Sequence, residues 1–208
     1  MNKERIALIR KIVVYTLYIC LIPSFQVSFP ESISLYGQTA DLMLVFTVLV
    51  SYMFGFADGA VIGIIIGIFR DCFSPPLIQL NSESAPVTAF GIGILIMFLA
   101  SVCGSSLFTV RMKRNTAFAF ASVAFATLMY KILGHLIIMG WTALFAHQGY
   151  GLSFKQIVLG SVLPQLLLNL IVTVPLILLL MFLGPYKKGK NPKISDERSS
   201  EDVSWLSI

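Results

Sequence analysis

Long apolar segments dominate this chain and restrict what it can fold into. Their approximate bounds are 6–28, 40–54, 57–73, 86–110, 117–146 and 156–183. A helix needs roughly 17 to 25 apolar residues to cross the hydrocarbon core of a bilayer, and most of these segments reach that length. A membrane barrel would instead need strands of about ten residues that alternate in polarity, whereas these segments are apolar on every side. The sequence therefore predicts an all-α integral membrane protein with six transmembrane helices.

The composition agrees with this interpretation. Hydrophobic residues make up 57% of the chain, charged residues make up only 12%, and the mean hydropathy is +0.86. A soluble domain carries about twice that share of charged residues. No small-residue cleavage site follows the first apolar segment, so we interpret it as a retained helix. We assign residues 1–186 to a transmembrane domain and residues 187–208, which are polar and mixed in charge, to a disordered cytoplasmic tail.

Lys and Arg residues outside the predicted spans fall on one side of the membrane. Those that precede or begin the first span, separate the fourth from the fifth or follow the sixth are Lys3, Arg5, Arg10, Lys11, Arg111, Lys113, Arg114, Lys187, Lys188, Lys190, Lys193 and Arg198. The opposite loops, at 29–39, 74–85 and 147–155, contain only Lys155. Because basic loops stay in the cytoplasm, both termini are predicted to be cytoplasmic. The net charge of +5 reflects this asymmetry, so we expect the tail to contact membrane lipids and we expect no nucleic-acid binding.

The stretch GFADGAVIGIIIGIFRDCF, residues 55–73, places two charges at the end of an apolar segment. In an antiparallel hairpin that turns near residues 55 and 56, Asp41 lies level with Arg70. We therefore expect these two side chains to pair at the outer interface of the membrane, where water solvates both charges. Adjacent residues point to different faces of a helix, so Asp71 needs a separate partner. We expect its carboxylate to accept hydrogen bonds from the start of the following loop.

Three glycines in the same stretch lie on one face of the predicted helix. Gly59, Gly63 and Gly67 are spaced four residues apart and form a flat strip that allows another helix to approach closely. The partner helix is either part of the protein's own bundle or part of another membrane protein. The sequence favours packing inside the bundle and leaves the second alternative open.

A second polar set lies within the last two predicted spans. Lys131 and His135 are four residues apart, as are Gln165 and Asn169. With a turn near residue 150, Lys131 is predicted to face Asn169, and His135 to face Gln165. An unpaired ammonium near the middle of a span is unfavourable by about 3 kcal/mol, which makes this cluster notable. The cluster forms either a polar contact between the two helices or a site for a ligand or partner.

The sequence contains none of the motifs that indicate an enzyme. It lacks G-x-S-x-G, H-E-x-x-H and a phosphate-binding loop, and its two histidines, His135 and His147, have no carboxylate near them in sequence. The cysteines Cys20, Cys72 and Cys103 are scattered, which is typical of small apolar residues within helices. We predict no catalytic residue, no metal site and no cofactor.

Two segments resemble the rod shape-determining MreD family of bacterial membrane proteins. One is ADLMLVFTVLVSYMFGFADGAVIGIIIGIFRDCFSPP, residues 40–76, in which Gly67, Ile68 and Asp71 match the family's G-[LI]-x-x-D pattern at the end of the third helix. The other is GSVLPQLLLNLIVTVPL, residues 160–176, which is similar to the family's last helix and includes Pro164 and Asn169. The length, the six predicted spans and the basic tail also agree with the family.

The resemblance implies a non-enzymatic scaffold of the cell-elongation machinery in the bacterial cytoplasmic membrane. Its implied partners are MreC, the actin-like MreB, and peptidoglycan synthases of the RodA and penicillin-binding class. The family also resembles in fold the substrate-binding subunits of energy-coupling-factor vitamin transporters, and such a subunit is the alternative function. The first helix of those subunits typically carries A-x-x-x-A spacing, whereas residues 6–22 contain Ala7 alone. The scaffold function is therefore favoured.

Overall fold

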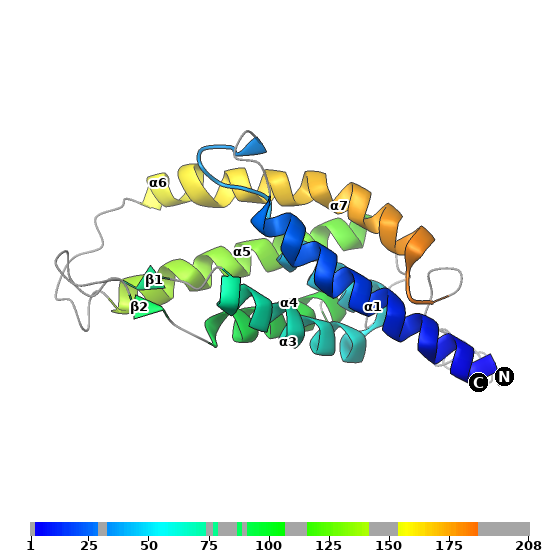
Figure 1. Ribbon diagram of the computed structural model, residues 1–208. Coiled ribbons are helices and arrows are strands. Elements are labelled where there is room, and N and C mark those ends of the chain that lie inside the picture. The colour runs from blue at the N-terminus through cyan, green and yellow to red at the C-terminus, as the bar shows by residue number, and fades with distance from the viewer. Residues whose placement is uncertain are drawn as a thin grey trace, which may run out of the picture.

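The protein folds into a helical bundle (Figure 1), and the computed structural model describes residues 3–28, 33–73, 77–78, 87–88, 91–106, 116–141 and 154–186. The long helices are α1 (Lys3–Val27), α2 (Leu42–Phe54), α3 (Phe56–Phe73), α4 (Ile92–Ser106), α5 (Thr116–Trp141) and α7 (Leu163–Leu183). A single turn, α6 (Phe154–Ile157), and a π-helical turn at Val158–Val162 lead directly into α7. Two short strands, β1 (Leu77–Ile78) and β2 (Val87–Thr88), pair antiparallel between α3 and α4.

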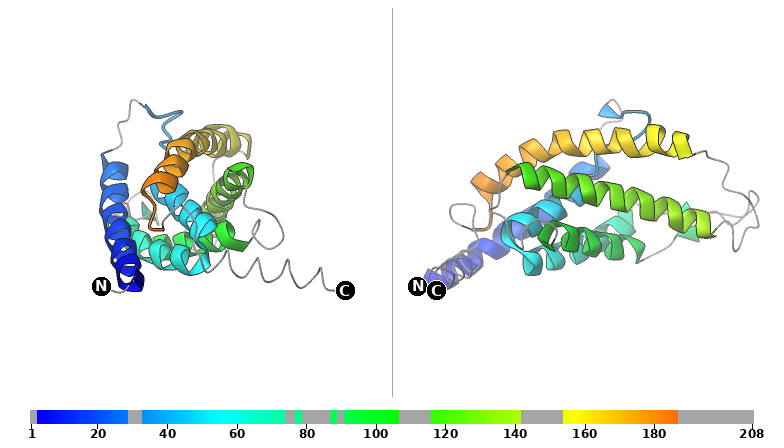
Figure 2. Two further views of the ribbon diagram at one scale, coloured as in Figure 1. Left: turned by 90° about the vertical axis from the view of Figure 1, so that its right-hand side faces the viewer. Right: turned by 180° about the vertical axis from the view of Figure 1, so that it is seen from behind.

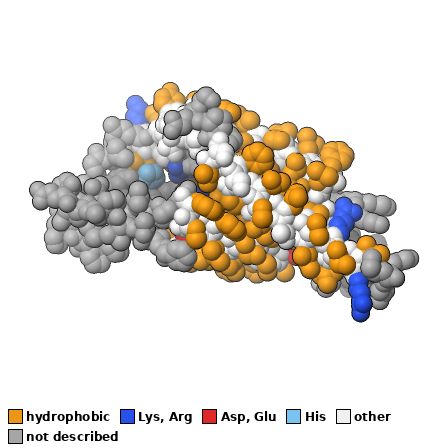
Figure 3. Space-filling view, in the orientation of Figure 1, with side chains coloured by type: hydrophobic (Ala, Val, Ile, Leu, Met, Phe, Trp, Pro, Cys, Tyr) orange, Lys and Arg blue, Asp and Glu red, His pale blue; other side chains and the backbone are white. Residues whose placement is uncertain are grey.

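Three helical segments are long and apolar enough to cross a membrane: Arg5–Val27, Thr116–Leu136 and Val158–Leu183. Figure 3 shows hydrophobic side chains covering the middle of one face of the molecule, while Lys and Arg lie near its ends. A soluble monomer does not expose so large an apolar surface, whereas lipid solvates it readily. The chain is therefore a helical membrane protein. The apolar helices Leu42–Phe54 and Ile92–Ser105 are shorter, and the arrangement in six spans stays a prediction.

The observed helices follow the predicted spans closely except at the start of the fourth. The predicted span 86–110 includes β2, and α4 begins only at Ile92. Gly91 precedes this helix with a φ of 101°, a conformation that strains any residue with a side chain. The residues on both sides of Gly91 are apolar, so a prediction from apolar content alone placed the start of this helix too early. Residues 142–146 of the fifth predicted span and the tail 187–208 lie outside the described residues.

Helix α2 is the centre of the bundle. It contacts α1, α3, α4, α5 and α7, and all of its residues except Met53 are buried. A helix that is hydrophobic all round is expected in such a position, because every face meets another helix. Helix α1 lies on the outside, and α1 begins at the same end of the molecule at which α7 ends (Figures 1 and 2).

The glycine strip of α3 packs inside the bundle, against α2 and α4. A Cβ atom added at Gly59 would overlap the Ser51 Cβ, and one added at Gly67 would lie 2.5 Å from the Ile94 Cα. At Gly63 it would lie 2.6 Å from the Ser101 Oγ. The close approach also allows hydrogen bonds between helices, since the Ser101 hydroxyl donates to the Gly59 carbonyl at 2.7 Å. The structure therefore agrees with the first alternative, in which the glycine strip packs against helices of the protein's own bundle.

Candidate functional site

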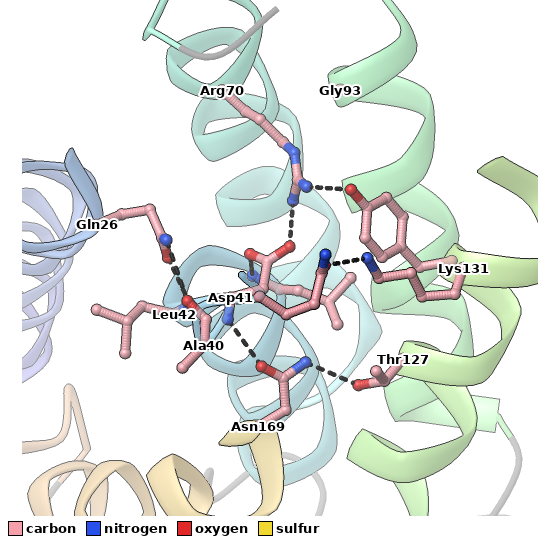
Figure 4. Close-up of polar contacts among 12 residues, drawn as sticks. Gln26, Ala40, Asp41, Leu42, Arg70, Gly93, Thr127, Lys131 and Asn169 are labelled. Atoms are coloured by element: carbon pink, nitrogen blue, oxygen red, sulfur yellow. Dashed lines mark hydrogen bonds and ion pairs between the residues drawn. The ribbon is translucent and has the colours of Figure 1, made fainter. Parts of the chain in front are cut away.

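Asp41 is the centre of a polar cluster inside the bundle (Figure 4). Its Oδ1 accepts a hydrogen bond from the Leu44 N–H at 3.0 Å and so caps the start of α2. Its Oδ2 lies 2.7 Å from a terminal nitrogen of Arg70, on α3. The expected pair between Asp41 and Arg70 therefore forms. We use the name Asp41 cluster for the side chains of Asp41, Arg70, Thr127, Tyr130 and Asn169.

The position of this ion pair differs from the prediction. The Asp41 and Arg70 side chains are only 7% and 15% exposed, so the pair is covered by protein and not solvated at an interface. The second terminal nitrogen of Arg70 donates to the Tyr130 hydroxyl at 2.7 Å, and the guanidinium lies 4.8 Å from the centre of the Tyr130 ring. Tyr130 belongs to α5, and the symmetry of the α2–α3 hairpin contains no information on the position of α5. The pair is therefore part of the core that joins α2, α3 and α5.

Asn169 brings α7 into the same cluster. Its Oδ1 accepts from the Asp41 backbone N–H at 2.7 Å, and its Nδ2 donates to the Thr127 hydroxyl at 3.0 Å. We expected Asn169 to face Lys131, but its partner on α5 is Thr127, one helical turn earlier. The prediction assumed a symmetric turn near residue 150 and an unbroken α-helix. The π-helical turn before α7, where the Leu163 N–H donates to the Val158 carbonyl, adds a residue to the turn and changes the register.

Lys131 has two neutral partners. Its ammonium donates to the Gln38 Oε1 at 2.8 Å and to the Ser161 hydroxyl at 3.0 Å. Ser161 lies in the π-helical turn, so this irregular turn supplies a hydrogen-bond acceptor to the half-buried Lys131 ammonium. His135, one turn further along α5, is also half-buried. His135 was predicted to face Gln165, but it forms no hydrogen bond with the Gln165 Oε1, which has no hydrogen-bond partner among the described residues.

Gln26 was not identified from the sequence, yet it fastens α1 to the start of α2. Its Nε2 donates to the Ala40 carbonyl at 3.0 Å and its Oε1 accepts from the Leu42 N–H at 2.6 Å. The Gln26 Oε1 thereby pairs with a backbone N–H group that the start of a helix leaves without an intrahelical partner. A single polar residue near the end of an apolar segment is a weak signal for such a contact.

A cavity of about 130 Å³ adjoins the Asp41 cluster. Its lining residues are Gln26, Thr39, Ala40, Asp41, Met43, Arg70 and Gln165. Four helices or their ends, α1, α2, α3 and α7, meet here. Gln165 is only 6% exposed, and its Oε1 is buried without a hydrogen-bond partner among the described residues.

Asp71 accepts hydrogen bonds from the first turn of α4, beyond the loop, and not from the start of the loop as predicted. Its carboxylate oxygens accept from the Gly93 N–H at 2.7 Å and from the Gly91 N–H at 2.8 Å. The side chain is buried, at 3% exposure. A carboxylate at the start of a helix satisfies free N–H groups and interacts favourably with the helix dipole. Asp71 therefore joins the end of α3 to the start of α4.

A second polar cluster lies at the opposite end of the α2–α3 hairpin. Asp58, in the first turn of α3, lies 2.6 Å from the Lys11 ammonium and accepts from the hydroxyls of Tyr15 at 2.8 Å and Tyr186 at 2.6 Å. We call these four residues the Asp58 cluster. Burial, and after it the hydrogen bond to Asp58, raises the pKa of Tyr186. Lys11 and Tyr15 share one face of α1, but nothing in the sequence places that face against Asp58 and Tyr186.

The described part of the chain contains no group of His, Cys, Asp and Glu side chains that could hold a metal ion. Its polar clusters are hydrogen-bonded networks between helices, and a small cavity adjoins the Asp41 cluster. No known family model, curated protein or solved structure matches this chain.

Proposed function

We propose that this protein is a non-enzymatic membrane scaffold of the MreD family, which helps to maintain rod shape. In this proposal it lies in the bacterial cytoplasmic membrane and links MreC, MreB and peptidoglycan synthases of the RodA and penicillin-binding class. The proposal starts from the resemblance of residues 40–76 and 160–176 to that family.

One observation carries the proposal: the fold joins the two resembling segments through the residues that define them. Asp41 is the second residue of the first segment, and its backbone N–H donates to Asn169 of the second. Asp71, which ends the G-[LI]-x-x-D pattern, holds the start of α4. A scaffold needs a rigid framework that presents its outer faces to partners, and buried polar networks of this kind make a framework rigid.

A test of the scaffold proposal is the recovery of partners from native membranes. The tagged full chain is crosslinked in cells and purified in mild detergent, and the co-purifying membrane proteins are identified. We expect MreC and a peptidoglycan synthase, and we expect depletion of the protein to make rod-shaped cells round. Normal shape after depletion, together with no enrichment of these partners over an unrelated six-span membrane protein, would contradict the proposal.

The cavity beside Asp41 favours a second candidate, the vitamin-binding subunit of an energy-coupling-factor transporter. Sites for drug-sized ligands usually have volumes of about 300–1,000 Å³, whereas this cavity measures about 130 Å³. A vitamin would therefore require the helices around Gln165 and Arg70 to move apart. A vitamin that co-purifies with the protein in stoichiometric amount would reverse our ranking.

The proposed topology has six spans and both termini in the cytoplasm, because basic residues cluster on one side of the predicted spans. Labelling of single cysteines with a membrane-impermeant reagent tests this arrangement. A cysteine placed at Glu83 should react in intact cells, and one placed at Asn115 should react only after the membrane is opened. The reverse pattern would overturn the topology.

A further inference from the structure

We infer that the Lys131 ammonium, between α5 and the π-helical turn, is a binding site for a phosphodiester group, which carries one negative charge. This group belongs either to an anionic lipid or to a soluble molecule. The inference goes beyond the scaffold function and does not depend on it. It rests on the neutral partners of Lys131, on the donors that these partners keep and on the access to the site.

The first step concerns charge. Among the described residues, the carboxylates at the end of the bundle where α3 ends and α4 begins are those of Asp41 and Asp71. Asp41 is paired with Arg70, and Asp71 accepts from backbone N–H groups at the start of α4. Both hydrogen-bond partners of Lys131 are neutral side chains. A half-buried ammonium with neutral partners is unfavourable within a membrane, and a bound group with one negative charge would offset it.

A second cation adds to this effect. The Arg70 guanidinium lies 4.8 Å from the centre of the Tyr130 ring, and the Lys131 ammonium lies 5.9 Å from the same centre. Figure 4 shows the Arg70 and Lys131 side chains pointing toward the same region. Asp41 and Arg70 act on the Lys131 charge with opposite signs, so the ion pair does not supply Lys131 with a counter-charge of its own.

The second step concerns hydrogen bonds. An ammonium has three N–H donors, and the Gln38 Oε1 and the Ser161 hydroxyl oxygen accept from Lys131. Because Lys131 can only donate, both partners turn an acceptor toward it, and these two bonds do not use the Gln38 amide hydrogens or the Ser161 hydroxyl hydrogen. A group that only accepts hydrogen bonds fits such an arrangement. The unesterified oxygens of a phosphodiester are acceptors of this kind.

The third step concerns access. Gln38, Lys131, His135 and Ser161 are all half-buried, so none of them is sealed inside the bundle. Figure 3 shows a basic side chain and a histidine side by side where the visible face is hollowed. Lys131 precedes Leu136, the last residue of the apolar span of α5, by five residues, which corresponds to about 8 Å along the helix. The site is therefore close to the headgroup layer of the bilayer, where lipid phosphodiesters lie.

The test compares three probes on the full chain in uncharged detergent micelles, with bound molecules counted by native mass spectrometry. Phosphatidylglycerol carries the phosphodiester, and diacylglycerol has the same acyl chains without it. Glycerophosphoglycerol has the same phosphodiester without acyl chains. We expect one phosphatidylglycerol to bind roughly 10- to 100-fold tighter than diacylglycerol, the factor for a hydrogen bond to a charged group. Equally tight binding of glycerophosphoglycerol would support the site and assign it to a soluble ligand.

The matched variants are Lys131→Met and Lys155→Met, which each remove one ammonium, although Lys155 is exposed on α6. The preference for phosphatidylglycerol over diacylglycerol should disappear in Lys131→Met and persist in Lys155→Met. The inference would be overturned if the unaltered protein shows no preference, if the preference survives Lys131→Met, or if Lys155→Met loses it equally.

Ser161→Ala keeps the test decisive if Lys131→Met does not fold. This variant removes the hydroxyl beside the ammonium, and we expect it to bind phosphatidylglycerol roughly 2- to 10-fold more weakly, the factor for one neutral hydrogen bond. Unchanged affinity in Ser161→Ala would in that case overturn the inference. Partner recovery and cell shape test the scaffold function separately.

Discussion

The two ends of the α2–α3 hairpin each contain an aspartate paired with a basic residue, but the surroundings differ. At one end Asp41 and Arg70 are covered by α5 and α7, through Tyr130 and Asn169. At the other end Asp58 pairs with Lys11, whose side chain is 31% exposed. The first pair therefore belongs to the interior, whereas the second attaches α1 and the segment after α7 to the outside of the hairpin.

The contribution of an ion pair to stability depends on what solvates one charge when its partner is lost. Removal of Lys11, whose side chain is partly exposed, lets water reach the Asp58 carboxylate, although the Asp58 side chain is itself only 10% exposed. Removal of Arg70 leaves the Asp41 carboxylate largely enclosed by helices, where water solvates it poorly, and the loss is larger. The same pair of residue types is thus expected to matter much more beside α5 than beside α1.

The largest expected effect is that of Arg70→Met, which leaves the Asp41 carboxylate buried without its charged partner. We expect the free energy of unfolding, measured by SDS titration in mixed micelles, to fall by about 3–5 kcal/mol. The double variant Asp41→Asn with Arg70→Met should recover part of the loss, since it removes the unpaired charge. A loss below about 1 kcal/mol in the single variant would show that water reaches Asp41 and that the two ends are alike.

The middle of the hairpin connects the two clusters, and Gly63→Leu tests it. A leucine there would overlap Ser101 and the Met97 carbonyl, and overpacking of this kind typically lowers the free energy of unfolding by about 1–3 kcal/mol. Ile64→Leu is the control, because Ile64 is exposed on another face of α3. Equal stability of the two variants in the same SDS titration would mean that α3 and α4 can separate without loss.

Lys11→Met should have a much smaller effect than Arg70→Met. Asp58 keeps the hydroxyls of Tyr15 and Tyr186 as donors, and water can approach where Lys11 was. We expect a loss of about 0–1 kcal/mol in the free energy of unfolding. A loss as large as that of Arg70→Met would remove the proposed difference between the two ends.

The smallest expected effect concerns pH and Tyr186. The pKa of Tyr186 is raised from the ordinary value of 10.0 in the folded protein, so the unfolded chain loses this proton first. The stability that the neutral hydroxyl contributes is therefore complete below pH 10 and declines as the pH rises above it. The variant Tyr186→Phe should show a shallower decline than the unaltered protein in unfolding titrations between pH 9 and about 11. Equal slopes for the two proteins would show that the Tyr186 hydroxyl has the same pKa in the folded and the unfolded state.

Much of the architecture could be predicted, because apolar length reports directly on helices in a membrane. The pairing of Asp41 with Arg70 also followed, since a short turn fixes the register of a hairpin by symmetry. The burial of this pair did not follow. It depends on Tyr130 and Asn169, which lie far away in sequence, and their approach is set by packing between helices that no short turn connects.

The register of α5 against α7 could not be predicted for a different reason. Lys131 and Asn169 are separated by a long connecting segment and by a π-helical turn. A π-helical turn changes the direction of every side chain after it, and nothing in the sequence near Ser161 marks it clearly. The Asp58 cluster was missed because it joins segments from opposite parts of the chain, and Gln26 was missed because its partners, 14 and 16 residues away, are backbone groups. Local side-chain spacing contains no information on such contacts.

The hydrogen bonds from Gly91 and Gly93 to Asp71 have a consequence for how this protein can vary. They hold together the two ends of the segment between α3 and α4, so the geometry of these helices does not depend on the residues in between. Closing a longer loop adds only about 0.6 kcal/mol for each doubling of its length. Residues 79–86 can therefore be exchanged, lengthened or fused to a foreign peptide, and the segment is a natural place to insert an epitope tag or to diversify by evolution.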